Sequence, residues 1–246
     1  MRTALAIALV LAGCVDEGPV RDGDPRGVFE LDEVRSMTLP KTVAGMDSDG
    51  AGGLWVIYEG ETALVHLDPQ GNTLATVPFE TSFTFVWTPI EGLALDGDRV
   101  WVSYDGVYML RAYDVVTGEL RGSFASETGL ADVDVFGDEL RYSVVWDTLV
   151  GLDMMRGGER WRRPYDDNCC GSQRGIASMT DDLAFVAKLT ERVFLVDRKV
   201  GVIGSGVHTF DTNGWFDIEH SHDLAWDGQY LLMQQENEIR WFEPLF

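Results

Sequence analysis

The stretch "GLALDGDRVWVSYDG", Gly92 to Gly106, decides the fold class. A short apolar run is followed by the polar turn "DGDR" and by a second apolar run, "VWVSY". Short runs rich in β-branched and aromatic residues, separated by Asp and Gly, are typical of antiparallel strands joined by a tight turn. The stretch therefore predicts a β-hairpin.

Related stretches recur along the chain and reveal an internal repeat. The first apolar residue after each turn gives the series Leu54, Val100, Leu140, Leu183 and Leu231. The intervals are 46, 40, 43 and 48 residues. Each interval has room for four short strands, which is the size of a β-propeller blade.

A second column of residues supports the repeat. Roughly a dozen residues after each anchor, an apolar strand ends in an acid: Asp68, Asp114, Asp153, Asp197 and Glu243. Four of these acids precede a glycine: Gly71, Gly118, Gly157 and Gly201. Aspartate opens turns by bonding nearby backbone N–H groups, and glycine tolerates the positive φ that closes them. The second column therefore predicts a turn before a fourth strand.

We predict an all-β fold, a five-bladed β-propeller over residues 28–246. The blades are expected near Val43–Phe79, Ile90–Ser126, Leu130–Tyr165, Arg174–Thr209 and His222–Phe246. The fifth repeat stops after three strands, whereas Val28–Leu39 reads as a strand without a blade. The N-terminal strand is therefore expected to close the last blade and cover its edge. A β-sandwich is the alternative, which the regular intervals disfavour.

The first 27 residues are interpreted as a targeting and anchoring segment rather than as part of the folded domain. The apolar run Ala4–Ala12 is too short to cross a bilayer, which takes about 20 helical residues. Leu11-Ala12-Gly13-Cys14 resembles the lipobox of bacterial lipoproteins. The resemblance implies that residues 1–13 are a signal peptide and that Cys14 becomes the acylated first residue. The alternative is an ordinary signal peptide with a chance cysteine.

Residues 14–27 are predicted to form a flexible tether, since they combine Pro, Gly and acids without an apolar period. The expected location is the cell envelope, with the body lipid-anchored beside a membrane. Val15 follows the cysteine, and the aspartate that favours inner-membrane retention in some bacteria is absent there. This favours the outer membrane, with the protein facing the periplasm or the exterior.

The charge balance narrows the class of partner. The chain carries 41 acidic and 19 basic residues, a net charge of −22. Such a field repels phosphates, so no nucleic-acid partner is expected. No EF-hand pattern occurs, and we predict neither a cofactor nor a metal ion. The acid excess is interpreted as a solvated surface.

The segments leading into the innermost strands are where a ligand pocket is expected. These segments differ in their polar residues from one repeat to the next. The candidate pocket comprises Trp87, Glu91, Arg174, His220 and His222. The two histidines, with Glu219 or Asp223, could bind a metal or act as a base. Polar loop residues bonded to backbone are the favoured alternative.

Cys169 and Cys170 are adjacent, so they cannot join distant parts of the fold. Outside the cytoplasm they could form a vicinal disulfide. Two reduced, partly buried thiols are the equal alternative, and the sequence leaves the choice open.

The recurring pattern "GxAxDGxxxWV" resembles bacterial propellers of the NHL-type, quinoprotein-like and plant-type glutaminyl cyclase groups. The last group is five-bladed, and an E-G-L segment supplies its glutamate, which Glu91-Gly92-Leu93 matches. The resemblance implies that Glu91 would shuttle a proton. The family's F-T-Q-G-L segment corresponds to "TVAGM", Thr42 to Met46, which lacks the Phe and the Gln.

Two classes of function remain. The favoured one is a binding module for a peptide, a glycan or an envelope protein, because it demands least of the residues. The alternative is an enzyme similar to plant-type glutaminyl-peptide cyclotransferase. Whether the protein is an enzyme, and with which catalytic residues, stays open at this point.

Overall fold

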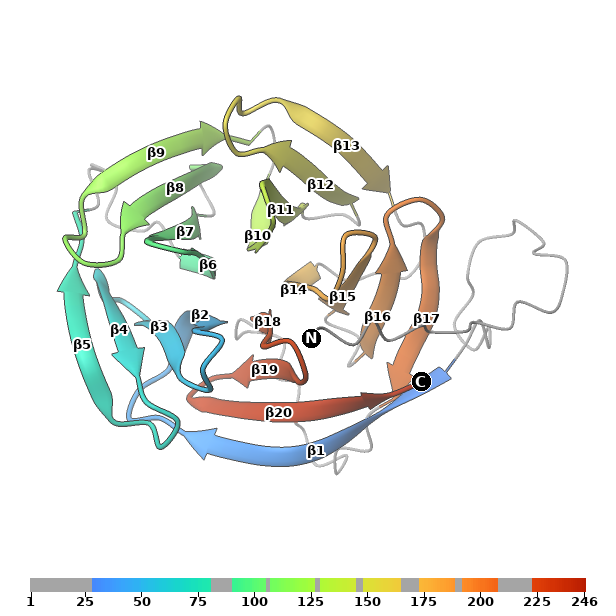
Figure 1. Ribbon diagram of the computed structural model, residues 1–246, viewed down its shortest axis with the longest axis horizontal. Helices are drawn as coiled ribbons and strands as arrows, with labels where there is room; N and C mark the ends of the chain where they lie inside the picture. The colour runs from blue at the N-terminus through green and yellow to red at the C-terminus, as the bar shows by residue number, and fades with distance from the viewer. Residues whose placement is uncertain are drawn as a thin grey trace, which may run out of the picture.

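The computed structural model describes residues 28–80, 90–104, 107–126, 129–144, 148–164, 173–188, 192–207 and 223–246. Within these ranges the chain forms twenty β-strands around a central axis (Figure 1). The same residues contain no helix that is long and apolar enough to cross a membrane.

Five groups of four antiparallel strands surround the axis, which confirms the five-bladed all-β prediction. Blade 1 is β2 (Val43–Ser48), β3 (Leu54–Tyr58), β4 (Ala63–Leu67) and β5 (Thr73–Pro78). Blade 2 is β6 (Ile90–Asp96), β7 (Arg99–Tyr104), β8 (Met109–Asp114) and β9 (Leu120–Ala125). Blade 3 is β10 (Leu130–Phe136), β11 (Glu139–Val144), β12 (Thr148–Asp153) and β13 (Glu159–Pro164). Blade 4 is β14 (Gln173–Ser178), β15 (Leu183–Lys188), β16 (Arg192–Asp197) and β17 (Gly201–Val207).

Blade 5 is completed by the N-terminal strand, as predicted. It contains β18 (Leu224–Trp226), β19 (Leu231–Gln235), β20 (Glu238–Leu245) and β1 (Val28–Thr38). β1 runs antiparallel to β20, from the pair Glu30 and Leu245 to the pair Thr38 and Glu238. The outer edge of β20 is therefore covered by the other end of the chain.

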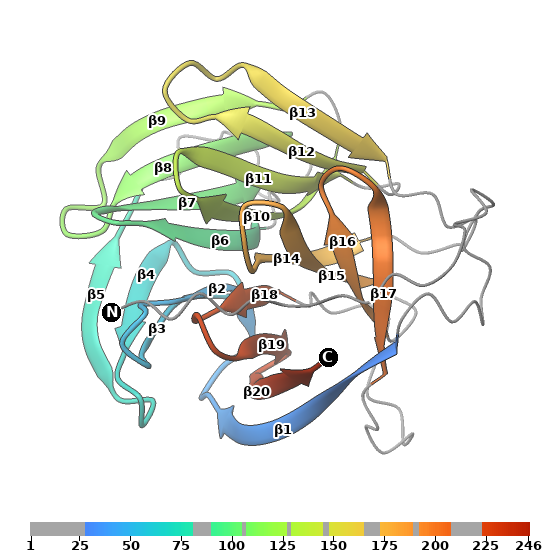
Figure 2. The same cartoon turned by 45° about the vertical axis from the view of Figure 1, so that its right-hand side comes forward.

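β1 also makes a contact that the repeat does not predict. Its first residues, Val28–Glu30, pair in parallel with Ser205–Val207 of β17. β1 thus bridges the outermost strands of blades 4 and 5, which form one continuous eight-stranded sheet. Figure 2 shows β1 running along the outside of blade 5, with its first residues beside the end of β17. Pairing of β1 with β20 closes the ring within blade 5, and pairing of β1 with β17 joins blade 5 to blade 4.

The predicted turns between third and fourth strands have the expected chemistry. Asp114 Oδ1 accepts the backbone N–H groups of Val116 and Thr117 at 2.9 and 2.8 Å. Gly118 then takes a φ of 71°. Asp68, Asp153 and Asp197 repeat the arrangement. Glu243 opens no such turn, because β20 continues alongside β1, where Glu243 pairs with Asp32.

One anchor of the repeat is displaced by a residue. Leu183 pairs with Asp197 just as Arg99 pairs with Asp114, so the residue equivalent to Val100 is Ala184. Ala184 is buried, whereas Leu183 is only partly buried. Leu183 therefore occupies the position that Arg99 has in blade 2. Choosing the first apolar residue after each turn as the anchor placed this blade's anchor one residue too early.

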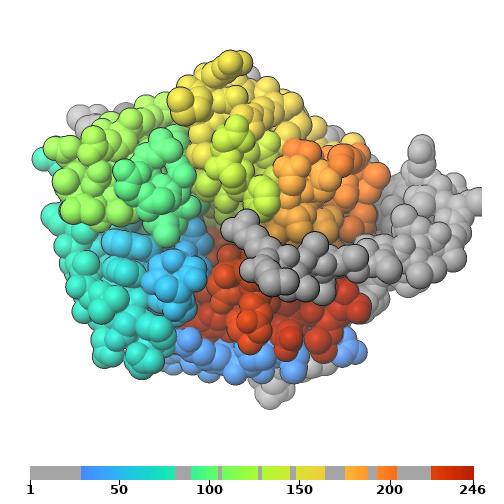
Figure 3. Space-filling view, viewed as in Figure 1, coloured from blue at the N-terminus to red at the C-terminus, as the bar shows by residue number. Residues whose placement is uncertain are grey.

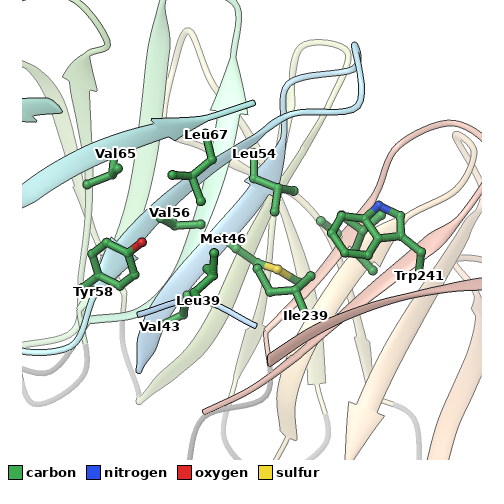
Figure 4. Packing of buried hydrophobic residues seen from close by; sticks show 12 residues of the cluster. Leu39, Val43, Met46, Leu54, Val56, Tyr58, Val65, Leu67, Ile239 and Trp241 are labelled. Carbon is green, nitrogen blue, oxygen red and sulfur yellow. The ribbon is translucent and has the colours of Figure 1, made fainter. Parts of the chain in front are cut away.

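Five apolar clusters fill the five seams between adjacent blades. The blades abut closely around the ring in the space-filling view (Figure 3). Figure 4 shows the seam between blades 5 and 1, where Met46 of β2 lies near Ile239 of β20. Among the described residues, the seam between blades 3 and 4 has the smallest apolar cluster, with six buried residues: Leu149, Ile176, Ala184, Val186, Phe194 and Val196. That seam must draw more of its stability from polar contacts.

Candidate functional site

A β-bulge recurs near the start of the innermost strands. The ladder shifts between Val43 and Gly45 in β2, and at the equivalent step in β6, β10 and β14. The extra residues are Ala44, Glu91, Ala131 and Arg174. A bulge re-aims the side chain that it carries. Two of the predicted pocket residues, Glu91 and Arg174, therefore occupy the same repeat position in blades 2 and 4.

The other predicted residues cannot be placed with them. Trp87, His220 and His222 lie outside the described residues, as do Cys14, Cys169 and Cys170. Arg174 is described in its backbone only. In the sequence, His222 precedes Asp223 as Glu91 precedes Gly92, so the repeat aligns His222 with the bulge position.

Glu91 is partly buried, and the residue after it is held by a close approach of two blades. A Cβ atom built on Gly92 would lie 1.8 Å from Asp132 Oδ1 and 3.0 Å from the Asp132 Cα. A side chain fits there only if β6 and β10 separate or the Asp132 carboxyl is displaced. The glycine beside Glu91 is therefore required by the carboxylate that packs against it.

The innermost strands also carry a set of acids that the sequence analysis did not identify as a group. Asp132 Oδ2 accepts the backbone N–H of Ile176 at 2.6 Å, and Asp134 Oδ2 accepts that of Ser178. Both acids stand on β10 and both acceptors reach β14 of the next blade. The innermost strand has one edge without a neighbouring strand, so its N–H groups need acceptors from elsewhere.

Asp47 and Asp223 follow the same rule in other blades. Asp47 Oδ2 accepts the N–H of Leu95 in blade 2 at 2.6 Å. Asp223 Oδ2 accepts the N–H of Met46 in blade 1 at 2.5 Å. We call Asp47, Asp132, Asp134 and Asp223 the axial carboxylates. Each joins its own blade to the innermost strand of the following blade.

The sequence shows that two of these acids share a face, but not which groups they bond. In "ADVDVF", Ala131 to Phe136, aspartates alternate with valines, so both acids must share one face of the strand. The equivalent positions in blades 2 and 4 hold Gly92 with Ala94, and Gly175 with Ala177. Those blades contribute no carboxylate, which is why the set is irregular and hard to recognise.

Two axial carboxylates also affect each other's protonation. Asp132 and Asp223 are both fully buried. Burial raises the pKa of Asp132 well above its ordinary value, and the neighbouring Asp223 raises it further. Burial likewise raises the pKa of Asp223, to about 8. Burial therefore favours the neutral, protonated form of these carboxyl groups.

The other two axial carboxylates are less buried than Asp132 and Asp223, and their pKa values are also raised. Both Asp47 and Asp134 are partly buried. Burial raises the pKa of Asp47, and the charge of Asp134 adds to the effect. Burial also raises the pKa of Asp134, although bonds from Ser178 and the nearby charge of Arg141 oppose it.

A buried ion pair reinforces the seam with the smallest apolar core. Arg141 of β11 is 2% exposed and donates to Glu139 Oε1 at 2.6 Å. Its guanidinium also donates to the carbonyls of Thr180 and Asp181 at 2.9 and 2.6 Å. The Trp161 indole N–H donates to the second Glu139 oxygen at 2.8 Å. These bonds connect blade 3 to a turn of blade 4.

The described residues contain no group of three or more His, Cys, Asp or Glu side chains that could bind a metal ion together. In this region carboxylates accept hydrogen bonds from backbone N–H groups, and a partly buried glutamate, Glu91, lies at one of the bulges.

Comparisons with known proteins give a fold rather than a family. No family model matches the chain, and no curated protein matches it. The crystal structure of Myxococcus xanthus glutaminyl cyclase is similar, with a TM-score of 0.69 and 12% identity. The match covers 93% of this chain and 99% of that one. A crystal structure of Chaetomium thermophilum Raptor matches 78% of this chain and 18% of that chain, with a TM-score of 0.49 and 10% identity. The chain thus shares the β-propeller fold of a glutaminyl cyclase.

Proposed function

We propose that the protein is a ligand-binding β-propeller, held at the cell envelope by lipid on Cys14. The observation that carries the binding proposal is the unequal occupancy of the bulge position. Blades 2 and 4 have Glu91 and Arg174 there, whereas blades 1 and 3 have Ala44 and Ala131. The bulge recurs at one rim of these four blades, but its side chain differs from blade to blade. A propeller can gain a specific ligand in this way without a change in its core.

The chemistry of this rim favours a peptide-like ligand that carries charge. A carboxylate and a guanidinium two blades apart suit a ligand with an amino group at one end and an acidic group at the other. The net charge of −22 steers cationic ligands toward the protein. A glycan or an envelope protein would meet the same rim.

Calorimetric titration of the full chain in detergent tests the binding proposal. A panel of cationic peptides and neutral glycans is screened first, and the tightest ligand is then titrated into Glu91→Gln. Loss of the charge should weaken binding of a cationic ligand by about 10- to 150-fold, since charged hydrogen bonds contribute about 1.5–3 kcal/mol. Glu119→Gln, at an exposed residue following a blade 2 turn, is the matched control. Equal affinity in both variants would remove Glu91 from the site.

Metabolic labelling with a fatty-acid analogue tests the anchor. The wild-type chain should take up the label and sediment with membranes, whereas Cys14→Ser should do neither. An unlabelled wild-type protein, or a labelled Cys14→Ser variant, would contradict lipidation at this residue. The binding proposal does not depend on that result.

A second candidate function is cyclisation of an N-terminal glutaminyl residue. Glu91-Gly92-Leu93 lies on the innermost strand of blade 2, in a fold shared along 99% of the Myxococcus xanthus glutaminyl cyclase chain. Against this stands Ala44, which occupies in blade 1 the position of Glu91 and corresponds to the glutamine of the F-T-Q-G-L segment. The binding proposal expects no ammonia release from a glutaminyl peptide. Release that is lost in Glu91→Gln would establish the enzyme instead.

A further inference from the structure

Most of the exposed apolar side chains lie at one position of the repeat. Among the described residues nine large apolar side chains are exposed, and seven of these lie where the third strand of a blade gives way to the fourth. We call these seven the apolar belt: Leu74, Val116, Leu120, Met155, Val200, Leu245 and Phe246. We propose that the apolar belt docks on the surface of a lipid bilayer. This docking depends on the lipid anchor proposed for Cys14.

The turns of three consecutive blades carry the most exposed members of the belt. Val116, Met155 and Val200 lie between the third and fourth strands of blades 2, 3 and 4, and they are 78%, 84% and 69% exposed. The fold does not require these residues, because blade 1 has the polar Gln70 at the position of Val116. Apolar residues scattered singly over a surface are ordinary, whereas their recurrence at one edge indicates an interaction surface.

The apolar belt lies on the face opposite the candidate pocket. Consecutive strands of a blade are antiparallel, so the connections between them alternate between the two faces of the ring. The third-to-fourth turns therefore share one face, and the segments that enter the innermost strands, with Glu91, lie on the other. Figure 1 shows the turns β8–β9, β12–β13 and β16–β17 spaced around the outer edge of the ring. A flat surface can contact all three turns while the face with Glu91 points away from it.

The segment that would carry the lipid joins the fold beside the belt. Phe29, near the start of β1, contacts Phe246, with ring centroids 5.6 Å apart. Cys14 precedes Val28 by 14 residues, and a segment of that length spans at most about 50 Å. An acyl chain on Cys14 would therefore keep the belt close to the bilayer. Docking then becomes an intramolecular event, for which individually weak apolar contacts suffice.

The charge near the exposed turns permits contact with phospholipid. The net charge of −22 opposes approach to an anionic membrane, but it is not concentrated here. The turn "DMMRGGER", 153–160, has two acids and two bases, and "DRKVG", 197–201, has one acid and two bases. Asp153 Oδ2 accepts a hydrogen bond from Arg160 at 2.9 Å, which neutralises it. Arg156 is exposed directly after Met155, so a cation adjoins an apolar side chain, as favours binding to phospholipid headgroups.

Spin labels on the anchored full chain test the docking. The variants Val116→Cys, Met155→Cys and Val200→Cys are each labelled with a nitroxide in a chain in which Cys169 and Cys170 are replaced by serine. The labelled protein is inserted into vesicles of phosphatidylethanolamine and phosphatidylglycerol. Oxygen is enriched in a bilayer, whereas a water-soluble nickel chelate is excluded from it. The ratio of oxygen to nickel accessibility should be several-fold higher at each turn than in Glu59→Cys. That control label lies at an exposed residue between β3 and β4, on the opposite face.

Polar substitutions at the belt provide a second test. In the chain labelled through Met155→Cys, the further changes Val116→Asn and Val200→Asn should reduce the ratio toward that of Glu59→Cys, because two of the three apolar contacts are lost. Val34→Asn is the matched control, since Val34 is an exposed apolar residue outside the belt, and the ratio should not change. An unchanged ratio in the Val116→Asn/Val200→Asn chain would count against docking through these turns.

Flotation of the vesicles distinguishes failure of the docking from failure of the anchor. A chain that does not float with the vesicles has no lipid anchor, which overturns both proposals. A floating chain whose turn labels match Glu59→Cys is anchored but not docked, which overturns the docking alone. Low accessibility to both reagents at the turns would show that another protein, or a second copy of this chain, covers the belt. That result would also overturn docking on lipid.

Discussion

Replacing Gly92 with alanine tests whether the approach of blades 2 and 3 is as tight as the structure indicates. The added Cβ would lie 1.8 Å from Asp132 Oδ1. A flexible side chain could swing aside, but this carboxyl is fully buried and bonded to Val133 and Ile176. Either β6 must move away from β10, or Asp132 must give up its partners.

Both routes are costly. Overpacking a core costs about 1–3 kcal/mol. Breaking a hydrogen bond to a buried charged or polar group also costs about 1–3 kcal/mol. By either route we therefore expect Gly92→Ala to lower the free energy of unfolding by roughly 1–3 kcal/mol, which corresponds to a fall in Tm of roughly 2–12 °C for a domain of this size.

The matched control is Gly122→Ala in β9. Its added Cβ would approach nothing closer than a Trp101 ring atom at 4.0 Å, and its φ is not in the left-handed region. Loss of glycine flexibility should leave that variant within about 1 kcal/mol of the wild type. Calorimetry and denaturant unfolding measure both variants. Similar stabilities for the two would refute the claim that Asp132 determines the residue at position 92.

Three further predictions address the ion pair, the N-terminal strand and an outer turn. Arg141→Met should lower the free energy of unfolding by about 3–5 kcal/mol, because Glu139 is left buried without its cation; Arg141→Met/Glu139→Gln should recover part of it in denaturant melts, and no recovery would contradict the pairing. Deleting residues 28–38 should expose the edge of β20 and produce aggregation in size-exclusion chromatography; a stable monomer would argue against closure by β1. Hydrogen bonds from Thr117 and Arg121 lower the pKa of Asp114, so its contribution is present above about pH 4 and is lost on acidification; the stability difference between wild type and Asp114→Asn should therefore shrink below that pH, and a constant difference would show that the carboxylate charge is irrelevant.

The architecture was predictable because its determinants are local. An aspartate that bonds the next two backbone amides, followed by a glycine at positive φ, is encoded within five residues, as at Asp114 and Gly118. The missing fourth strand of the last repeat also predicts its replacement by β1. The anchor at Leu183 was displaced because an apolar residue alone does not fix the register of a strand.

The axial carboxylates were missed for the opposite reason. Their acceptor atoms meet amides 44 to 177 residues away, and a backbone N–H has no side-chain signature in the sequence. The parallel pairing of β1 with β17 is equally invisible, since it uses backbone groups only. At the candidate site, the shared repeat position of Glu91 and Arg174 follows from the alignment, but a bulge becomes evident only from the strand register.

The uneven distribution of the axial carboxylates divides the seams between blades into two kinds. Among the described residues, blades 1, 3 and 5 reach forward with acids, whereas blade 2 has Gly92 and Ala94 at the equivalent positions. Blade 4 likewise has no such acid toward blade 5, and there β1 spans the junction from outside. The seam between blades 2 and 3 therefore depends on its apolar cluster, so a polar substitution in that cluster should open the ring more readily than one at a seam that a carboxylate also joins.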